Sequence, residues 1–190
     1  SLRGWLLLER FGLGFRTTVL DFSGRDVERQ LGSYRPARTV PTLVTPEGAI
    51  VSDSLAIAEE LATRHPEVGH WPADPLRRAT ARTLAAEMHS GVAALRAACP
   101  MATRVAYADF VPSDAIRADL SRIEELWSHA RAMAGEGPWL FGAYTAADIT
   151  YRWTNGDPRG LLVVGIGVVL GGLVIAGVGG IVRRFRGMPV

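Results

Sequence analysis

The sequence of 190 residues contains no lysine and only one cysteine. A single cysteine, Cys99, excludes an internal disulfide, so we expect the chain to suit a reducing compartment. Cys99 could act as a reactive thiol, but a lone cysteine is more often a small buried apolar residue. Because every strongly basic residue is arginine, 21 arginines stand against 19 acidic residues, and the formal net charge is +2.

The sequence also lacks a concentrated basic face. Arginines are dispersed among acidic residues, except for Arg183, Arg184 and Arg186 near the C-terminal end. Binding to nucleic acid requires clustered positive charge, so we expect no nucleic-acid partner, and we expect no metal site either. The chain opens on Ser1 without an initiator methionine or a signal peptide, so we expect it to be a fragment.

One long segment lacks charge altogether. From Leu161 to Val182 there is no charged or strongly polar side chain. A helix of this length covers ~30 Å, the thickness of the hydrocarbon core of a bilayer, and helix is the one structure in which a single segment satisfies its own backbone in lipid. Aromatic residues before the segment and arginines after it resemble interfacial anchors. The segment therefore predicts one transmembrane helix, with a buried core helix as the alternative.

Two further predictions depend on this segment. Gly167 and Gly171 form a G-x-x-x-G pair, which indicates either a close helix–helix contact or the ordinary glycine content of a membrane helix. The arginines after the segment favour a cytoplasmic C-terminus, whereas Arg152 and Arg159 before it weigh against that orientation. For the chain as it stands we expect a single-pass membrane localisation.

The first part of the chain alternates helix and strand patterns. Apolar spacing, β-branched runs and turn residues predict helix, strand, short helix, two strands and helix, in that order, over Leu2–Phe11, Phe15–Phe22, Arg25–Gly32, Thr42–Thr45, Ala49–Val51 and Ser52–His65. The turn Pro46-Glu47-Gly48 between the two short strands is a tight hairpin signal. This order predicts an α/β lobe over residues 1–65.

From residue 66 onward the pattern is helical. A linker with Pro72 in its middle is expected over residues 66–75. Two apolar stripes at helical spacing follow it, the first formed by Leu84, Met88, Val92 and Leu95, and the second by Ile116, Leu120, Ile123, Trp127 and Ala130. A third helix is expected to begin at Thr145. We therefore expect an all-helical lobe over 76–150 and a tail over 151–190 that holds the predicted span at 161–182.

Two short motifs indicate where a ligand could bind. Val40-Pro41 precedes a predicted strand, a position that suits a residue without an amide donor. If this bond is cis, the amide and carbonyl of Val40 face outward and can pair with a peptide-like group. Val51-Ser52-Asp53-Ser54 opens a predicted helix, whose free amides and dipole favour a carboxylate, and the Ser54 hydroxyl adds a donor. A plain N-cap is the alternative interpretation of this second motif.

Taken together, these motifs closely resemble the glutathione-binding half of glutathione S-transferases, in the stretch Thr39-Val40-Pro41-Thr42-Leu43 … Val51-Ser52-Asp53-Ser54-Leu55-Ala56-Ile57. The opening Ser1-Leu2-Arg3-Gly4-Trp5-Leu6 resembles the end of a bacterial serine-type pattern. Glu87-Met88-His89-Ser90-Gly91 with Cys99-Pro100-Met101 resembles the fourth helix of bacterial members related to the zeta group. Phe141-Gly142-Ala143-Tyr144-Thr145-Ala146-Ala147-Asp148 resembles the family's capping box. The resemblance implies a thioredoxin-like lobe followed by an all-α lobe.

The resemblance also implies which residues bind glutathione, the expected co-substrate. Val40 and Pro41 would meet its cysteinyl part, Val40 pairing through its backbone, while Asp53 and Ser54 would hold its γ-glutamyl end. In this family the enzyme lowers the pKa of the glutathione thiol by hydrogen-bonding the thiolate, which makes it a better nucleophile.

For the substrate pocket, the resemblance implies a wall that includes Met88 and His89. His89 is better interpreted as a partly exposed helix residue than as a catalytic base. The serine that stabilises the thiolate in the family is expected before Ser1, so no catalytic residue is assigned.

Both ends of the family pattern are incomplete. The first strand of the thioredoxin-like lobe is expected to be missing together with the serine, and the core helix that begins at Thr145 meets the stop signal Asn155-Gly156-Asp157-Pro158. The predicted fold class is thus a thioredoxin-like α/β lobe without its first strand, a truncated all-α lobe and one transmembrane helix.

Three interpretations of function remain open. The first is an enzyme that conjugates glutathione to small electrophiles or carries out a related isomerisation, as a homodimer, with the transferase-like part in the cytoplasm. The second is a non-catalytic, membrane-tethered module that uses the same fold for protein contacts. The third is that the tail belongs to another reading frame and was joined to the rest artefactually.

Overall fold

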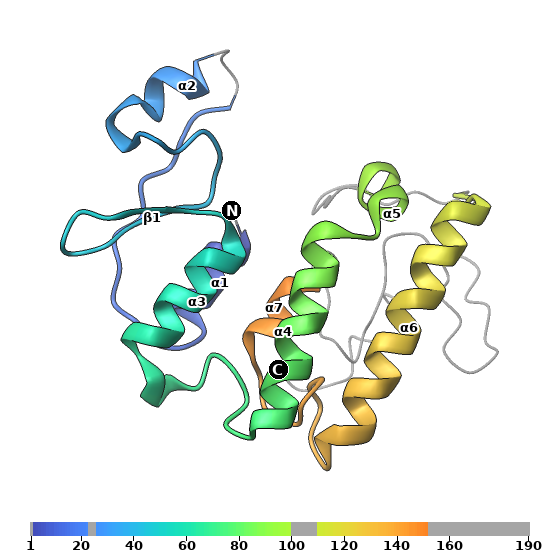
Figure 1. The fold of residues 1–190 in the computed structure, drawn as a ribbon. Coiled ribbons are helices and arrows are strands. Elements are labelled where there is room, and N and C mark those ends of the chain that lie inside the picture. The colour runs from blue at the N-terminus through green and yellow to red at the C-terminus, as the bar shows by residue number, and fades with distance from the viewer. Residues whose placement is uncertain (1, 23–25, 100–109, 152–190) are drawn as a thin grey trace, which may run out of the picture.

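A computed structural model of the chain describes residues 2–22, 26–99 and 110–151 (Figure 1). The N-terminal elements are three helices, a 3₁₀ turn and a hairpin, namely α1 (Leu2–Glu9), α2 (Val27–Gln30), η1 (Gly32–Tyr34), β1 (Thr42–Val44), β2 (Ile50–Ser52) and α3 (Ser54–Arg64). After the 3₁₀ turn η2 (Pro66–Val68), the remaining elements are helices: α4 (Pro75–Ser90), α5 (Ala93–Ala98), α6 (Asp114–Ala134) and α7 (Ala146–Thr150). In Figure 1 the hairpin and α1–α3 lie on one side, and the long helices α4 and α6 run side by side on the other.

The hairpin forms where the turn signal predicts it. β1 and β2 pair antiparallel, with Thr42 opposite Ser52 and Val44 opposite Ile50. The turn is closed by hydrogen bonds from the Thr45 amide to the Ala49 carbonyl and from the Gly48 amide to the Thr45 carbonyl. Gly48 has a φ of +88°, a conformation that glycine adopts without a steric penalty. The hairpin prediction is therefore confirmed.

The strand predicted over Phe15–Phe22 is wrong. Residues 13–22 form no strand or helix, although their β-branched alternation fits a pleated surface. A strand needs a neighbour that accepts and donates its backbone hydrogen bonds, and no described residue pairs with the backbone of residues 14–20. The local propensity is present, but no partner strand is found among the described residues.

The first helical stripe is interrupted. α4 ends at Ser90, and Val92 takes a left-handed conformation with φ +46° before α5 begins. The residues of the stripe, Leu84, Met88, Val92 and Leu95, are nonetheless all buried. The stripe thus predicts the inward face correctly but not the break.

The capping box at the start of α7 is confirmed. Thr145 donates from its amide and its hydroxyl to Asp148 Oδ2, at 2.8 and 2.9 Å, and the Leu140 amide donates to Asp148 Oδ1 at 2.9 Å. α7 as described runs from Ala146 to Thr150. Asp148 is buried, so it anchors both the helix start and the preceding turn.

One apolar core spans both halves of the chain. Its most buried members include Leu7 from α1, Ile57 from α3, Leu84 from α4 and Ile149 from α7. The segment 66–75 takes part in this packing, because His70 is buried and accepts a hydrogen bond at its carbonyl from the Ala146 amide, 2.8 Å away.

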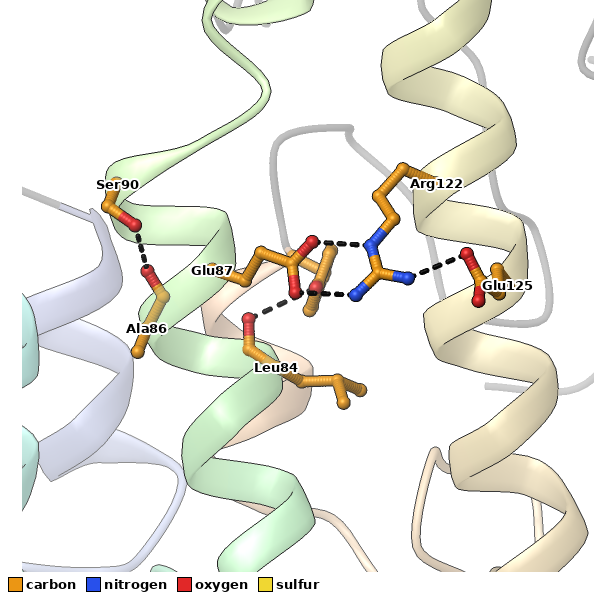
Figure 2. Close-up of polar contacts among 7 residues, drawn as sticks. Leu84, Ala86, Glu87, Ser90, Arg122 and Glu125 are labelled. Carbon is orange, nitrogen blue, oxygen red and sulfur yellow. Dashed lines mark hydrogen bonds and ion pairs between the residues drawn. The ribbon is translucent and has the colours of Figure 1, made fainter.

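Figure 2 shows how α4 and α6 are joined at their surface. Arg122 of α6 forms a two-pronged ion pair with Glu87 of α4, at 2.6 and 3.0 Å, and a third contact with Glu125 at 2.6 Å. Beneath it, the buried Tyr151 donates its hydroxyl to the Leu84 carbonyl, 3.1 Å away. These contacts join α6 to α4, the helix that carries His89.

Among the described residues, none of the helices has both the length and the apolar composition needed to cross a membrane. The predicted span Leu161–Val182 and the rest of the tail lie outside those residues. The transmembrane helix therefore stays a prediction.

Candidate functional site

The hairpin brings the two predicted ligand motifs together. Thr42 lies opposite Ser52 in the ladder, so Pro41, which precedes β1, and Asp53, which follows β2, are at the same end of the hairpin. This juxtaposition joins residues that are separated by the whole hairpin in sequence.

The first motif is held by close packing on α1. The Val40–Pro41 peptide bond is cis. This is the condition that the sequence analysis set for an outward-facing amide and carbonyl at Val40. A Cβ placed on Gly4 of α1 would meet Pro41 Cβ at 2.6 Å and Cγ at 2.9 Å, so the helix backbone rests directly on the proline ring. Val40 is half-buried, and its amide and carbonyl form no hydrogen bond with any other described residue. They are therefore open to a ligand.

The second motif is both an N-cap and an open helix start. Asp53, with φ +79°, accepts a hydrogen bond at Oδ1 from the Leu55 amide, 2.7 Å away, and its carbonyl accepts from the Ile57 amide. Within the described part of the chain, the amides of Ser54 and Ala56 have no acceptor. The N-cap interpretation is thus correct, and it leaves two amides and the Ser54 hydroxyl available for an anion at the positive end of the α3 dipole.

His89 reaches this site from the other half of the molecule. Its Nε2 lies 3.1 Å from Asp53 Oδ2, and both side chains are about two-fifths exposed. The sequence pointed to His89 as a pocket-wall residue but not to this pairing. Met88, its neighbour, is 1% exposed and lies inside the core, so its predicted role on the pocket wall stays a prediction without an open surface to support it.

Two arginines that the sequence did not point to, Arg3 and Arg96, add positive charge near Asp53 and His89. Burial lowers the pKa of the Arg3 guanidinium, nearby Arg96 lowers it further, and Asp53 raises it, which places all three within one electrostatic neighbourhood. Arg96 also donates to the His89 carbonyl at 2.6 Å. Arg3, His89 and Arg96 come from three different helices, so no sequence spacing links them.

The site can therefore hold a peptide-like zwitterion. Asp53 offers a carboxylate to an ammonium group, the start of α3 and the two arginines favour carboxylates, and Val40 offers one amide and one carbonyl to an extended backbone. Cys99, the single cysteine, is buried, and burial raises the pKa of its thiol. Over residues 2–22, 26–99 and 110–151 we find no cluster of three or more histidine, cysteine or acidic residues that could hold a metal ion.

Comparison with known proteins shows that the N-terminal part of the chain is similar to one family. Residues 1–64 match the model of the glutathione S-transferase N-terminal domain. A Caenorhabditis elegans protein described as "Probable maleylacetoacetate isomerase" is 37% identical over 92 residues, which are 48% of this chain and 42% of that protein.

Solved structures share the fold at lower identity. Glutathione transferase Omega 1C from Trametes versicolor is 22% identical, with a TM-score of 0.59 over 78% of this chain and 61% of that one. A theta-class glutathione S-transferase from Xanthomonas axonopodis pv. citri, solved with glutathione bound, is 24% identical, with a TM-score of 0.53 over 78% of this chain and 72% of that one. The chain thus spans less than half of its curated relative and about three-fifths of the Trametes structure.

Proposed function

We propose that the chain is a glutathione S-transferase-like protein that binds glutathione and uses it as a co-substrate. Residues 1–64 match the N-terminal domain of that family, and the described part shares the thioredoxin-like fold with a helical second half of the solved glutathione transferases. The observation that carries this proposal is that Pro41 and Asp53 flank the Thr42–Ser52 pair at one end of the hairpin, beside the open start of α3.

The proposed binding mode assigns each group of glutathione to a feature of the site. The cysteinyl peptide unit pairs with the Val40 amide and carbonyl. The γ-glutamyl ammonium binds Asp53, and the γ-glutamyl carboxylate binds the Ser54 hydroxyl and the free amides of α3. Arg3 and Arg96 make the surrounding potential positive, which favours a ligand that carries two carboxylates and one ammonium group.

The proposed reaction is attack of the glutathione thiolate on a small electrophile, or a related isomerisation through a transient adduct. The identity to the C. elegans protein supports the isomerisation and a position near the zeta group. In either reaction the chain must hold glutathione and lower the pKa of its thiol. We assign the first task to the residues above and leave the second to a hydroxyl group that the family resemblance places before Ser1.

Titration calorimetry of the whole chain with glutathione tests the proposal. Asp53→Ala removes a charge-assisted contact, so we expect the Kd to rise roughly tenfold or more, and Ser54→Ala should raise it several-fold. Asp74→Ala is the matched control, because Asp74 also caps a helix through a 2.8 Å hydrogen bond from the Arg77 amide but lies outside the site. Absence of binding at millimolar glutathione would refute the proposal.

Measuring the rate of conjugation distinguishes an enzyme from a non-catalytic binding module. A chromogenic electrophile reports conjugation directly, and a rate above the uncatalysed background that falls in Asp53→Ala would establish a transferase. Glutathione binding without any such rate would instead favour a binding module built on the same fold.

Membrane attachment and a homodimer are kept as separate proposals. If Leu161–Val182 spans a bilayer, the full chain should sediment with membranes and resist alkaline extraction. Val169→Arg should weaken this association, because an arginine at the centre of a span costs about 3 kcal/mol of insertion free energy. Light scattering of detergent-solubilised chain would count the protomers.

A further inference from the structure

Asp53, the carboxylate assigned to the ligand ammonium group, is contacted from both halves of the molecule. Its Oδ1 accepts a hydrogen bond from the Leu55 amide at 2.7 Å, and its Oδ2 lies 3.1 Å from Nε2 of His89, near the C-terminal end of α4. A carboxylate offers about four acceptor positions, so Asp53 can still receive an ammonium group. The imidazole of His89 and that ammonium group would then share one negative charge.

The charge of the imidazole depends on pH. Histidine is the side chain that ordinarily changes from neutral to cationic between about pH 8 and about pH 5, and the side chain of His89 is 40% exposed, so it is open to protons from solvent. A neutral imidazole leaves the charge of Asp53 available to a ligand. An imidazolium group offsets that charge and repels a second cation beside it.

The other charged groups around this pair are mostly positive. Arg96 of α5 donates to the His89 carbonyl at 2.6 Å. Arg3 of α1 is close enough to Asp53 and Arg96 for each of them to shift the pKa of its guanidinium. On α4 itself, Glu87 is engaged in the ion pair with α6. In the described part of the chain, no carboxylate besides that of Asp53 lies within ion-pair distance of His89, so a proton on the imidazole is offset by Asp53 alone.

We propose that the protonation state of His89 sets which ligands the γ-glutamyl part of the site accepts. Neutral His89 leaves Asp53 to an ammonium group, so the site selects ligands that carry one. Protonated His89 engages Asp53 itself, and the site then favours ligands that bring a carboxylate but no ammonium group to this position. This specificity-determining role of His89 rests on the proposed binding of glutathione at Asp53.

Titration calorimetry of the full chain with two ligands, at about pH 5.5 and about pH 7, tests this role. One ligand is glutathione, and the other is glutaryl-cysteinylglycine, the same tripeptide with hydrogen in place of the ammonium group. Acidification should weaken glutathione binding roughly threefold to tenfold, because a positive charge is added beside the ammonium group. It should tighten binding of the analogue roughly twofold or more, because the added charge attracts the remaining carboxylate. Neither ligand changes its own charge appreciably over this range.

Two histidine variants separate this role from a structural one. His89→Gln keeps a polar side chain that cannot gain a proton, so its affinity for glutathione should differ by less than about twofold between the two pH values. His65→Gln is the matched control. The side chain of His65 is also 40% exposed and lies 3.5 Å from a carboxylate, that of Glu67, but at the opposite end of α3 from Asp53. This control should keep the pH dependence of the unaltered chain.

The failure of this role can be distinguished from the failure of glutathione binding. If acidification weakens glutathione binding equally in the unaltered chain and in His89→Gln, or changes the affinity of the two ligands alike, the role of His89 is overturned and the binding proposal stands. Glutathione affinity that does not change with pH in the unaltered chain has the same consequence. Absence of glutathione binding at both pH values would refute both proposals.

Discussion

His70 shows how a single buried side chain ties the two halves together. It is 1% exposed, its Nε2 lies 2.9 Å from the Leu7 carbonyl, and its ring lies 4.1 Å from that of Phe11. With Nε2 donating to that carbonyl, the neutral ring leaves Nδ1 as an acceptor, and Nδ1 has no hydrogen-bond partner among the described residues. Protonation would bury an unsatisfied N–H donor and a charge.

We therefore expect stability to fall with acidification through this residue. Burial lowers the pKa of His70 despite the opposing bond to Leu7. The unfolded chain takes up a proton below about pH 6.5 while the folded chain resists it, so stability is intact above that pH and decreases as the pH falls further. Denaturant titrations from pH 7 to pH 5 should show the decline, and His70→Gln, less stable throughout, should show a flatter one. An identical slope in the variant would contradict this assignment.

Gly4 controls the position of the first ligand motif. Since a Cβ there would lie 2.6 Å from Pro41 Cβ, Gly4→Ala must push α1 away from the Val40–Pro41 turn. We expect a loss of about 1–3 kcal/mol in the free energy of unfolding from overpacking, together with weaker glutathione binding in calorimetry.

A matched control exists for this change. Gly32→Ala places a methyl group where nothing lies within 4 Å, so it should change neither quantity by a measurable amount. Unaltered glutathione affinity in a folded Gly4→Ala variant would show that the Val40–Pro41 turn does not position the ligand.

At the scale of elements, the sequence was most informative where the signals are local. The hairpin turn and the Thr145–Asp148 capping box were predictable because the interacting groups lie within a few residues of one another. The strand at Phe15–Phe22 was not, because strand formation depends on a neighbour that sequence patterns do not specify. Likewise, the apolar stripe through Val92 gave no sign of the left-handed turn that divides α4 from α5.

The start of α7 provides a test of one local signal. Asp148→Ala would leave the buried amides of Leu140 and Thr145 without their carboxylate acceptor, so we expect a loss of about 3 kcal/mol in stability. Asp148→Asn keeps one acceptor oxygen and should cost less. Thermal unfolding followed by circular dichroism measures both.

The exposed cap of α6 is the comparison for that test. Ser113 accepts from the Ile116 amide at 3.4 Å and is exposed, so Ser113→Ala should cost about 1 kcal/mol or less. Similar losses of stability at Ser113 and Asp148 would mean that burial of the capping box does not increase its contribution to the free energy of unfolding.

At the scale of the whole molecule, the candidate site is assembled from both halves. Asp53 lies at the end of the hairpin, whereas His89 and Arg96 come from α4 and α5. The sequence could point to the two hairpin motifs, because each consists of a few consecutive residues. It could not point to the arginines, because their proximity to Asp53 depends on how the helices pack.

The shared core carries the last prediction. Leu7, Ile57, Leu84 and Ile149 belong to one cluster that spans the predicted 1–65 and 76–150 lobes, so the two should unfold together in a single transition. Ile149→Ala in α7 should cost about 2–5 kcal/mol and should speed amide exchange in α3 as much as in α4. Leu76→Ala, at a side chain that is 69% exposed, should change stability by less than about 0.5 kcal/mol. Two separate transitions, or faster exchange confined to the helical half, would mean that the lobes fold independently and that the site forms only when they dock.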